Sequence, residues 1–176
     1  MIGIILSLTL TLSNVTLADD KPVHLEDLKC ETFKGMDLIG RKLPDVLVGS
    51  EKKFYAKKKA KFFGGSLLSD SIHGIDSWKI CNRTIEALVR VTSTGNIVRD
   101  VVEETSKSKH VRTIVTSGVA CKKGKDGLSD ILAFVDDSKE MEWFPAKKVF
   151  QINLKTEKFK EILAKDVQCE NVSYGE

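Results

Sequence analysis

Histidine is the commonest general base in enzymes, and one histidine of this sequence has carboxylates close by. His73 lies between Asp70 and Asp76 in the segment DSIHGID. Either aspartate could orient the imidazole, which would give the catalytic group of a small secreted hydrolase. The same residues also fit an ordinary polar loop, and they lack the helical spacing of a metal-binding histidine pair. We therefore predict no metal and no cofactor.

A second candidate site is a run of lysines between Gly49 and Gly65. If this segment is a β-strand, alternate residues point to opposite sides of the sheet. One side then carries Phe54, Ala56, Lys58, Ala60 and Phe62, and the other carries Lys53, Tyr55, Lys57, Lys59, Lys61 and Phe63. Lysines on that second side recur about every 6.6 Å along the strand, and Tyr55 adds an aromatic surface for stacking. Alternatively, the lysines only keep an edge strand soluble and prevent it from pairing with another chain.

The overall charge bears on what the lysine row would bind. The chain has 28 Lys and Arg against 25 Asp and Glu, for a formal net charge of +3. A nucleic-acid-binding domain usually has a much larger basic excess, so we expect no nucleic-acid partner. The predicted partner is an acidic protein or an anionic cell-envelope polymer.

Trp143 is a third candidate, because it follows the acidic segment 136–142. Tryptophan is enriched at the centre of protein interfaces, so an exposed Trp143 would be an interface anchor. The alternative is a core tryptophan, since the large apolar area of the ring favours burial.

The N-terminus predicts export. Residues 2–18 carry no charge, and Thr16 and Ala18 are small residues at the minus-three and minus-one positions of a cleavage site. We expect a signal peptide over 1–18 and a single domain over 19–176, in the periplasm or secreted. The apolar stretch is shorter than the ~20 residues of a membrane span, so no transmembrane segment is expected in the mature chain.

Export determines how the four cysteines are interpreted. Cys30, Cys81, Cys121 and Cys169 include no C-x-x-C pair, and an even number in an oxidising compartment predicts two disulfides. Three pairings are possible. Pairing sequence neighbours, Cys30 with Cys81 and Cys121 with Cys169, closes two loops of similar length and is the one we favour.

The elements that position these residues are mostly strands. Apolar residues alternate with polar ones from Cys81 to Val91, and the run 131–135 is wholly apolar, as in a central strand. Two short helices are also expected. One covers 37–48 with Asp37 as its N-cap, and the other covers 158–165, where Phe159, Ile162 and Leu163 have helical spacing. The predicted class is α+β, dominated by an antiparallel sheet.

The segment DLIGRKLPDVLVG, residues 37–49, resembles the opening of small bacterial envelope domains of the SmpA/OmlA and β-lactamase-inhibitor type. The resemblance covers these residues alone, assigns no functional residue and implies an exported binding domain. Together the patterns predict an exported binding or inhibitor-type protein, with the small secreted hydrolase as the alternative.

Overall fold

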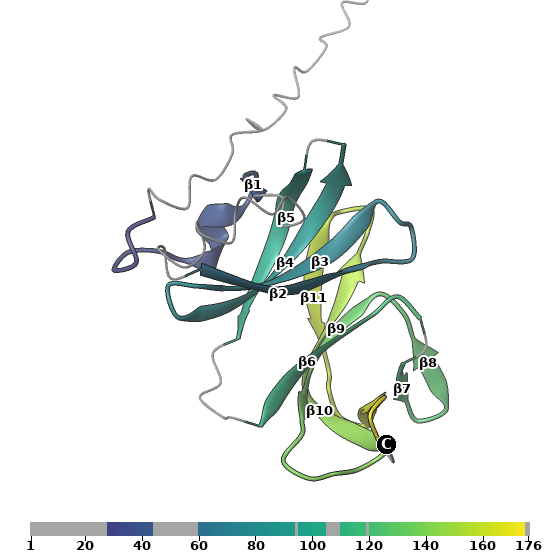
Figure 1. The fold of residues 1–176 in the computed structure, drawn as a ribbon. Helices are drawn as coiled ribbons and strands as arrows, with labels where there is room; N and C mark the ends of the chain where they lie inside the picture. The colour runs from purple at the N-terminus through teal and green to yellow at the C-terminus, as the bar shows by residue number, and fades with distance from the viewer. Residues whose placement is uncertain (1–27, 44–59, 94, 105–109, 119, 175–176) are drawn as a thin grey trace, which may run out of the picture.

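The computed structural model describes residues 28–43, 60–93, 95–104, 110–118 and 120–174 (Figure 1). Twelve β-strands fall within these ranges, together with one turn of 3-10 helix, η2 (Gly35–Leu38). The predicted signal peptide lies outside the described residues. Within them, no helix is long and apolar enough to cross a membrane.

The first sheet occupies the upper half of Figure 1 and is antiparallel throughout. Its strand order is β1-β5-β4-β3-β2, so β2 is an edge strand. The strands are β1 (Lys42–Leu43), β2 (Ala60–Leu67), β3 (His73–Ile80), β4 (Arg83–Thr92) and β5 (Gly95–Glu104).

The second sheet forms most of the lower half of Figure 1, while its strand β11 lies beside the first sheet and contacts β5; the sheet is centred on its longest strand. Strand β10 pairs with β12 near its start and with both β9 and β11 further along. The path of the sheet is β6-β9-β10-β12-β7-β8, with β11 attached to β10. The strands are β6 (Val111–Thr116), β7 (Cys121–Lys123), β8 (Asp126–Leu128), β9 (Ile131–Asp136), β10 (Trp143–Asn153), β11 (Lys158–Ile162) and β12 (Val167–Glu170).

Both faces of the first sheet are covered, one of them only in part. The N-terminal segment covers one face, where Phe33 and Leu38 pack with Trp78 and Ile85. The second sheet covers part of the other face, and this intersheet core consists of Leu68, Ile75, Leu88, Val102, Leu132, Phe134, Phe150 and Ile152. Because alternate residues of a strand point to opposite faces, polar residues of β3 and β4 on the second face are enclosed between the sheets.

The predicted α+β class is wrong, because neither expected helix is present in the described residues. In the first segment, Asp37 lies in the turn η2, and the chain then pairs with β5 as β1 instead of continuing as a helix. Gly40 has a φ of 79°, a left-handed value that ends any helical path there. Residues 44–48 lie outside the described residues.

The second expected helix, 158–165, is strand β11 over its first five residues. Phe159 packs in the intersheet core, whereas Ile162 packs in a third cluster formed around β7, β9, β10 and β12. Leu163 is 69% exposed. The spacing that resembled one helical stripe therefore came from a strand with apolar contacts on both faces.

The structure confirms both disulfides and the favoured pairing. Cys30 is bonded to Cys81, and Cys121 to Cys169, with sequence separations of 51 and 48. The first bridge ties the N-terminal segment to the turn between β3 and β4. The second lies between paired strands, because Cys121 is the direct partner of Cys169 across β7 and β12.

Each disulfide should make a similar contribution to stability, because the two loops are of nearly equal length. We expect Cys30→Ser with Cys81→Ser, and Cys121→Ser with Cys169→Ser, each to lower the free energy of unfolding by about 4 kcal/mol. Urea denaturation of the two double variants measures this. A loss below about 1 kcal/mol for either pair would contradict the chain-entropy argument.

Candidate functional site

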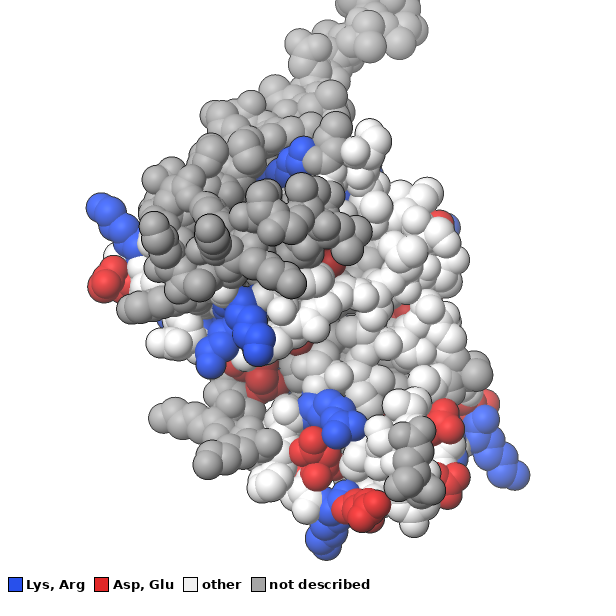
Figure 2. Space-filling model, viewed as in Figure 1, with Lys and Arg blue, Asp and Glu red and all other residues white. Residues whose placement is uncertain are grey.

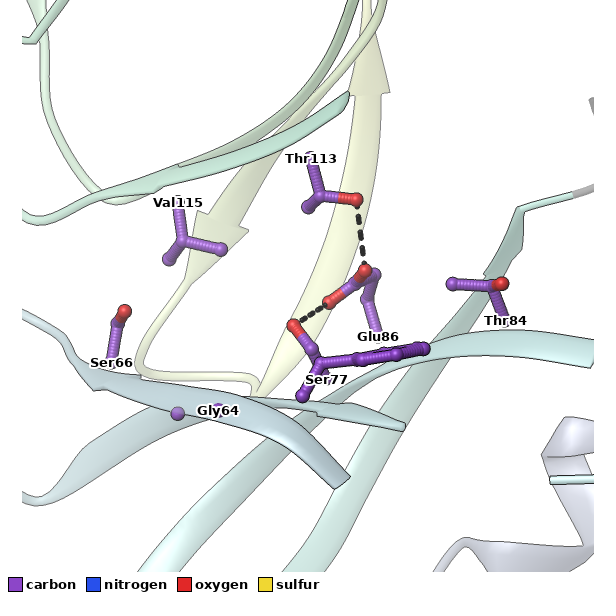
Figure 3. Close-up of a pocket in the computed structure, with 9 residues that line it drawn as sticks. Gly64, Ser66, Ser77, Thr84, Glu86, Thr113 and Val115 are labelled. Carbon is purple, nitrogen blue, oxygen red and sulfur yellow. Dashed lines mark hydrogen bonds between the residues drawn. The ribbon is translucent and has the colours of Figure 1, made fainter. Parts of the chain in front are cut away.

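A cavity of about 380 Å³ lies between the edge of the first sheet and strand β6 (Figure 3). Residues of both sheets line it, and hydroxyl groups predominate among their polar groups. The lining residues are Phe63, Gly64, Gly65, Ser66, Ser77, Thr84, Glu86, Thr113 and Val115.

A bulge in β2 shapes one wall of the cavity. Phe62 is paired with Trp78 and Gly64 with Ser77, so Phe63 is an extra residue in the ladder. Gly64 has a φ of 143°, a value that residues other than glycine rarely adopt. Bulges often redirect a side chain beside a functional site, and here the bulge places Phe63 and Gly64 at the cavity.

Glu86 is the one ionisable residue among those that line the cavity. It lies on β4, directly opposite Ser77 on β3, and is 1% exposed. Ser77 Oγ donates a hydrogen bond of 2.5 Å to Glu86 Oε2, and Thr113 Oγ1 donates one of 2.9 Å to Oε1. Figure 3 shows the carboxylate between these two hydroxyls, one from each sheet.

The surroundings of Glu86 oppose its ionisation. Burial raises the pKa of Glu86, the hydrogen bonds from Ser77 and Thr113 offset part of this effect, and the nearby charge of Glu104 adds to the increase. A carboxylate held in this way is more stable when a proton or a positive charge neutralises it.

The next row of residues on this face of the sheet is charged. Lys61 pairs with Lys79, Lys79 with Thr84, and Thr84 with Glu104 across β2, β3, β4 and β5. Lys61 is exposed, and its Nζ lies 5.2 Å from the centroid of the Phe63 ring. The row thus carries both signs of charge beside the cavity.

His73 belongs to a separate polar cluster at the other end of β3. Its Nδ1 lies 2.6 Å from Asp70 Oδ2, and its Nε2 lies 2.8 Å from Glu157 Oε1. Burial disfavours the charged imidazole, but hydrogen bonds to the two carboxylates outweigh it and raise the pKa of His73. The doubly protonated ring can donate to both carboxylates at once.

Glu157 also binds two arginines. Arg90 Nε and Arg99 Nε donate to its two oxygens at 2.7 and 2.6 Å. Burial would raise the pKa of Glu157, but hydrogen bonds from His73, Arg99 and Arg90 outweigh it and lower the pKa. Arg99 is the extra residue of a bulge in β5, opposite Leu88 and Val89. The cluster therefore fastens the turn between β10 and β11 to the first sheet.

This geometry does not favour the predicted hydrolase. Both ring nitrogens of His73 are engaged by carboxylates and the residue is 5% exposed, so neither nitrogen is available to take a proton from a substrate. Asp76 does not join the cluster, because it lies three residues along β3 and accepts a hydrogen bond from Asn96 Nδ2 at 2.8 Å. The structure thus brings Asp70 and His73 together but leaves Asp76 apart.

Most of the predicted lysine row lies outside the described residues, namely Lys53, Tyr55, Lys57 and Lys59. At its described end, Ala60 and Phe62 pack in the core beneath the N-terminal segment, whereas Lys61 is exposed on the opposite face. This alternation agrees with the strand arrangement that the sequence predicts. On the face seen in Figure 2, described basic and acidic side chains alternate over the second sheet without forming a patch of one sign.

Trp143 lies at the start of β10 and is partly buried. Lys122 Nζ lies 3.5 Å from the centroid of its ring. The fully buried tryptophan of the core is Trp78. The role of Trp143 as an interface anchor stays a prediction.

The sequence reasoning missed Glu86, Ser77 and Thr113 as functional candidates. Glu86 belongs to the polar half of the alternating pattern in β4, which was expected to lie opposite the core. The pattern shows which residues share a face, but not that a second sheet covers the polar face. An acidic residue next to Ala87 and Leu88 in a strongly apolar strand is the one available signal.

Within the described residues, no group of three or more His, Cys, Asp or Glu side chains is arranged to hold a metal ion. Comparison of the chain with protein-family models, with curated proteins and with solved structures finds no match. The site must therefore be interpreted from its own geometry.

His73→Gln should destabilise the fold in a pH-dependent way. The raised pKa of His73 means that its charge stabilises the fold below about pH 6.5, and that this contribution is lost as the pH rises through the folded-state pKa. The lowered pKa values of Asp70 and Glu157 mean that their contribution is lost only in acid. The loss should be about 1.5–3 kcal/mol near pH 6 and smaller near pH 9.

Urea denaturation of the wild type and the variant at several pH values measures this difference. His110→Gln is the control, because His110 is exposed and outside the cluster. A cost for His73→Gln that does not change with pH would contradict the charged state assigned to the ring.

Glu86→Gln should stabilise the ligand-free protein at neutral pH. Because its pKa is raised, Glu86 favours the fold at acid pH, and stability falls as the pH rises through its folded-state pKa. The glutamine variant lacks this loss, so its advantage should grow from pH 4 to pH 8. Thermal unfolding over this range is the measurement, with the exposed Glu161→Gln as a control that should show no such trend.

Proposed function

We propose that the protein is an exported binding protein that takes a small polar ligand into the cavity between its sheets. The observation that carries this proposal is the buried carboxylate of Glu86 in the cavity wall. An ionisable group with so little access to water is costly for a fold to retain, and perturbed groups in cavities are candidates for function. The cavity volume lies at the lower end of the range for ligand pockets.

The polar lining supports binding over catalysis. Ser66, Ser77, Thr84 and Thr113 supply hydroxyl groups that can donate or accept hydrogen bonds. Phe63 and Val115 add apolar contact area, which is the usual composition of a small-molecule site. Both nitrogens of His73 are engaged in its own cluster, so this ring supplies no free base.

Export is part of the proposal. The two disulfides are consistent with an oxidising compartment. The uncharged leader and its small residues at 16 and 18 support secretion or a periplasmic location.

The lysine row remains a second proposal for a partner of a different kind. Lys61 is exposed and lies on the same face of the sheet as Lys79, its direct cross-strand partner. If the strand continues towards residue 53 with the same alternation, its lysines would face an acidic protein or an anionic envelope polymer beside the cavity. This contact would be separate from the ligand in the cavity.

Ser66→Trp tests the cavity as the binding site. Ser66 lies on the exposed edge strand and lines the cavity, so an indole there should fill the space while the buried residues keep their contacts. We expect a screen of small amines, carboxylates and polyols by ligand-observed NMR to find binders of the wild type. Their affinity should fall at least about tenfold in Ser66→Trp.

Ser138→Trp is the matched control, because Ser138 is exposed in the turn between β9 and β10. It should bind the same compounds as the wild type. Binders that Ser66→Trp retains at full affinity would contradict the assignment of the cavity.

A further inference from the structure

We propose that the ligand of this cavity is a small organic cation, whose ammonium group pairs with the carboxylate of Glu86. This inference rests on the proposed function, because it names the chemical class that the same cavity would take.

The first observation is a contrast between two buried carboxylates. Glu157 has three cationic partners, namely His73, Arg90 and Arg99. Glu86 is more deeply buried, yet its described hydrogen bonds come from the neutral hydroxyls of Ser77 and Thr113. Among the described residues, no ion pair involves Glu86. At Glu157 the chain itself supplies the positive charge. At Glu86 the described residues supply none, so a cationic ligand could do so.

Burial with a neutral partner does not by itself distinguish Glu86, because Asp76 shares both features. Asp76 is also buried with a neutral partner, Asn96, and burial raises its pKa as well. Asp76 is not among the residues that line the cavity. Glu86 differs from Asp76 because it is buried beside a cavity that is large enough for a ligand.

The hydrogen-bonding capacity of Glu86 fits an ammonium group. Each carboxylate oxygen accepts one described hydrogen bond, and a carboxylate has about four lone-pair sites. An ammonium in the cavity could donate to an unused site, and the hydroxyls of Ser66 and Thr84 can accept its remaining N–H groups. A buried ion pair is favourable only when such further hydrogen bonds are made.

The nearby charges favour a cation at the inner wall. The charge of Glu104 raises the pKa of Glu86, so a second negative group acts on the same place. Lys79 lies in the same row as Glu104, on the other side of Thr84, and Lys61 is its partner on the edge strand, so the two lysines lie towards the edge of the sheet. Lys61 Nζ is directed at the Phe63 ring. Among the residues that line the cavity the one ionisable group is thus a carboxylate, and neither lysine is part of the lining.

The rest of the cavity limits the size of the ligand. Phe63 and Val115 offer a short apolar contact, and the volume of about 380 Å³ suits a compact molecule. A small primary or secondary amine with one ring or a short aliphatic body meets these conditions.

Three probes of matched size test the charge. They are 2-phenylethylamine as the cation, 2-phenylethanol as the neutral analogue and phenylacetate as the anion. Titration calorimetry on the oxidised full-length protein at neutral pH should show the amine binding at least about tenfold tighter than either analogue. Glu86→Gln should lose this preference and bind the amine no better than the alcohol. Glu161→Gln, an exposed glutamate on β11, should keep it.

The wild type provides a second measurement that needs no variant. The amine should lose affinity as the pH falls and Glu86 is protonated, while the affinity for the alcohol stays constant. Glu104, Lys61 and Lys79 are the other charged groups on this face, and Glu104→Gln should leave most of the pH dependence in place. This readout stands even if Glu86→Gln does not fold.

The outcomes separate the two proposals. If the alcohol or phenylacetate binds as tightly as the amine, and Ser66→Trp abolishes that binding, the cavity is a ligand site but the cationic ligand is wrong. If Glu86→Gln keeps the preference for the amine, the role of Glu86 is wrong. If the wild type binds none of the three probes at millimolar concentration, both the cationic ligand and the cavity as a ligand site are overturned.

Discussion

The covering of both faces of the first sheet, one of them only in part, is the constraint on which the rest of this structure depends. The N-terminal segment covers one face and the second sheet part of the other, so the polar side chains that the second sheet encloses must find partners inside the protein. Most buried polar groups in proteins meet this requirement through hydrogen bonds. In this protein the enclosed polar groups form two clusters, one around Glu157 and one around Glu86. The apolar intersheet core fills the rest of the space between the sheets.

The two clusters meet the same requirement differently. Around Glu157, positive and negative groups neutralise one another, and removal of Glu157 would take away the carboxylate that His73, Arg90 and Arg99 share. That cluster therefore fixes the position of the turn between β10 and β11 on the first sheet. Around Glu86, hydroxyls solvate the carboxylate but do not neutralise it. Among the described residues, the first carboxylate has cationic partners from the chain itself, whereas the second has neutral hydroxyl partners and borders a cavity.

Local patterns in the sequence were sufficient for the disulfides and for much of the strand content. Each disulfide joins two cysteines that are consecutive among the cysteines of the sequence. The unbroken apolar run 131–135 forms the central strand β9. The helix expected over 158–165 was wrong because Phe159 and Ile162 contact different cores on opposite faces of β11, which imitates helical spacing. Glu86 was not identified because its burial depends on Thr113, 27 residues away, and on the sheet that carries Thr113. Pairing between distant segments is information that periodicity does not contain. The predicted lysines at 53, 57 and 59 lie outside the described residues and stay untested.

The position of β12 has a consequence for how the chain folds. This strand is the last one described. It pairs with β10 on one side and with β7 on the other, and the bond between Cys121 and Cys169 links it to β7 as well. The second sheet therefore cannot be completed until the chain is available as far as residue 170. Sheets built on pairings this distant in sequence form slowly, and before closure their unpaired strand edges are open to other chains. The oxidation that links residue 121 to residue 169 is thus coupled to the pairing of β12 with β7, because the two cysteines are direct partners in that pairing.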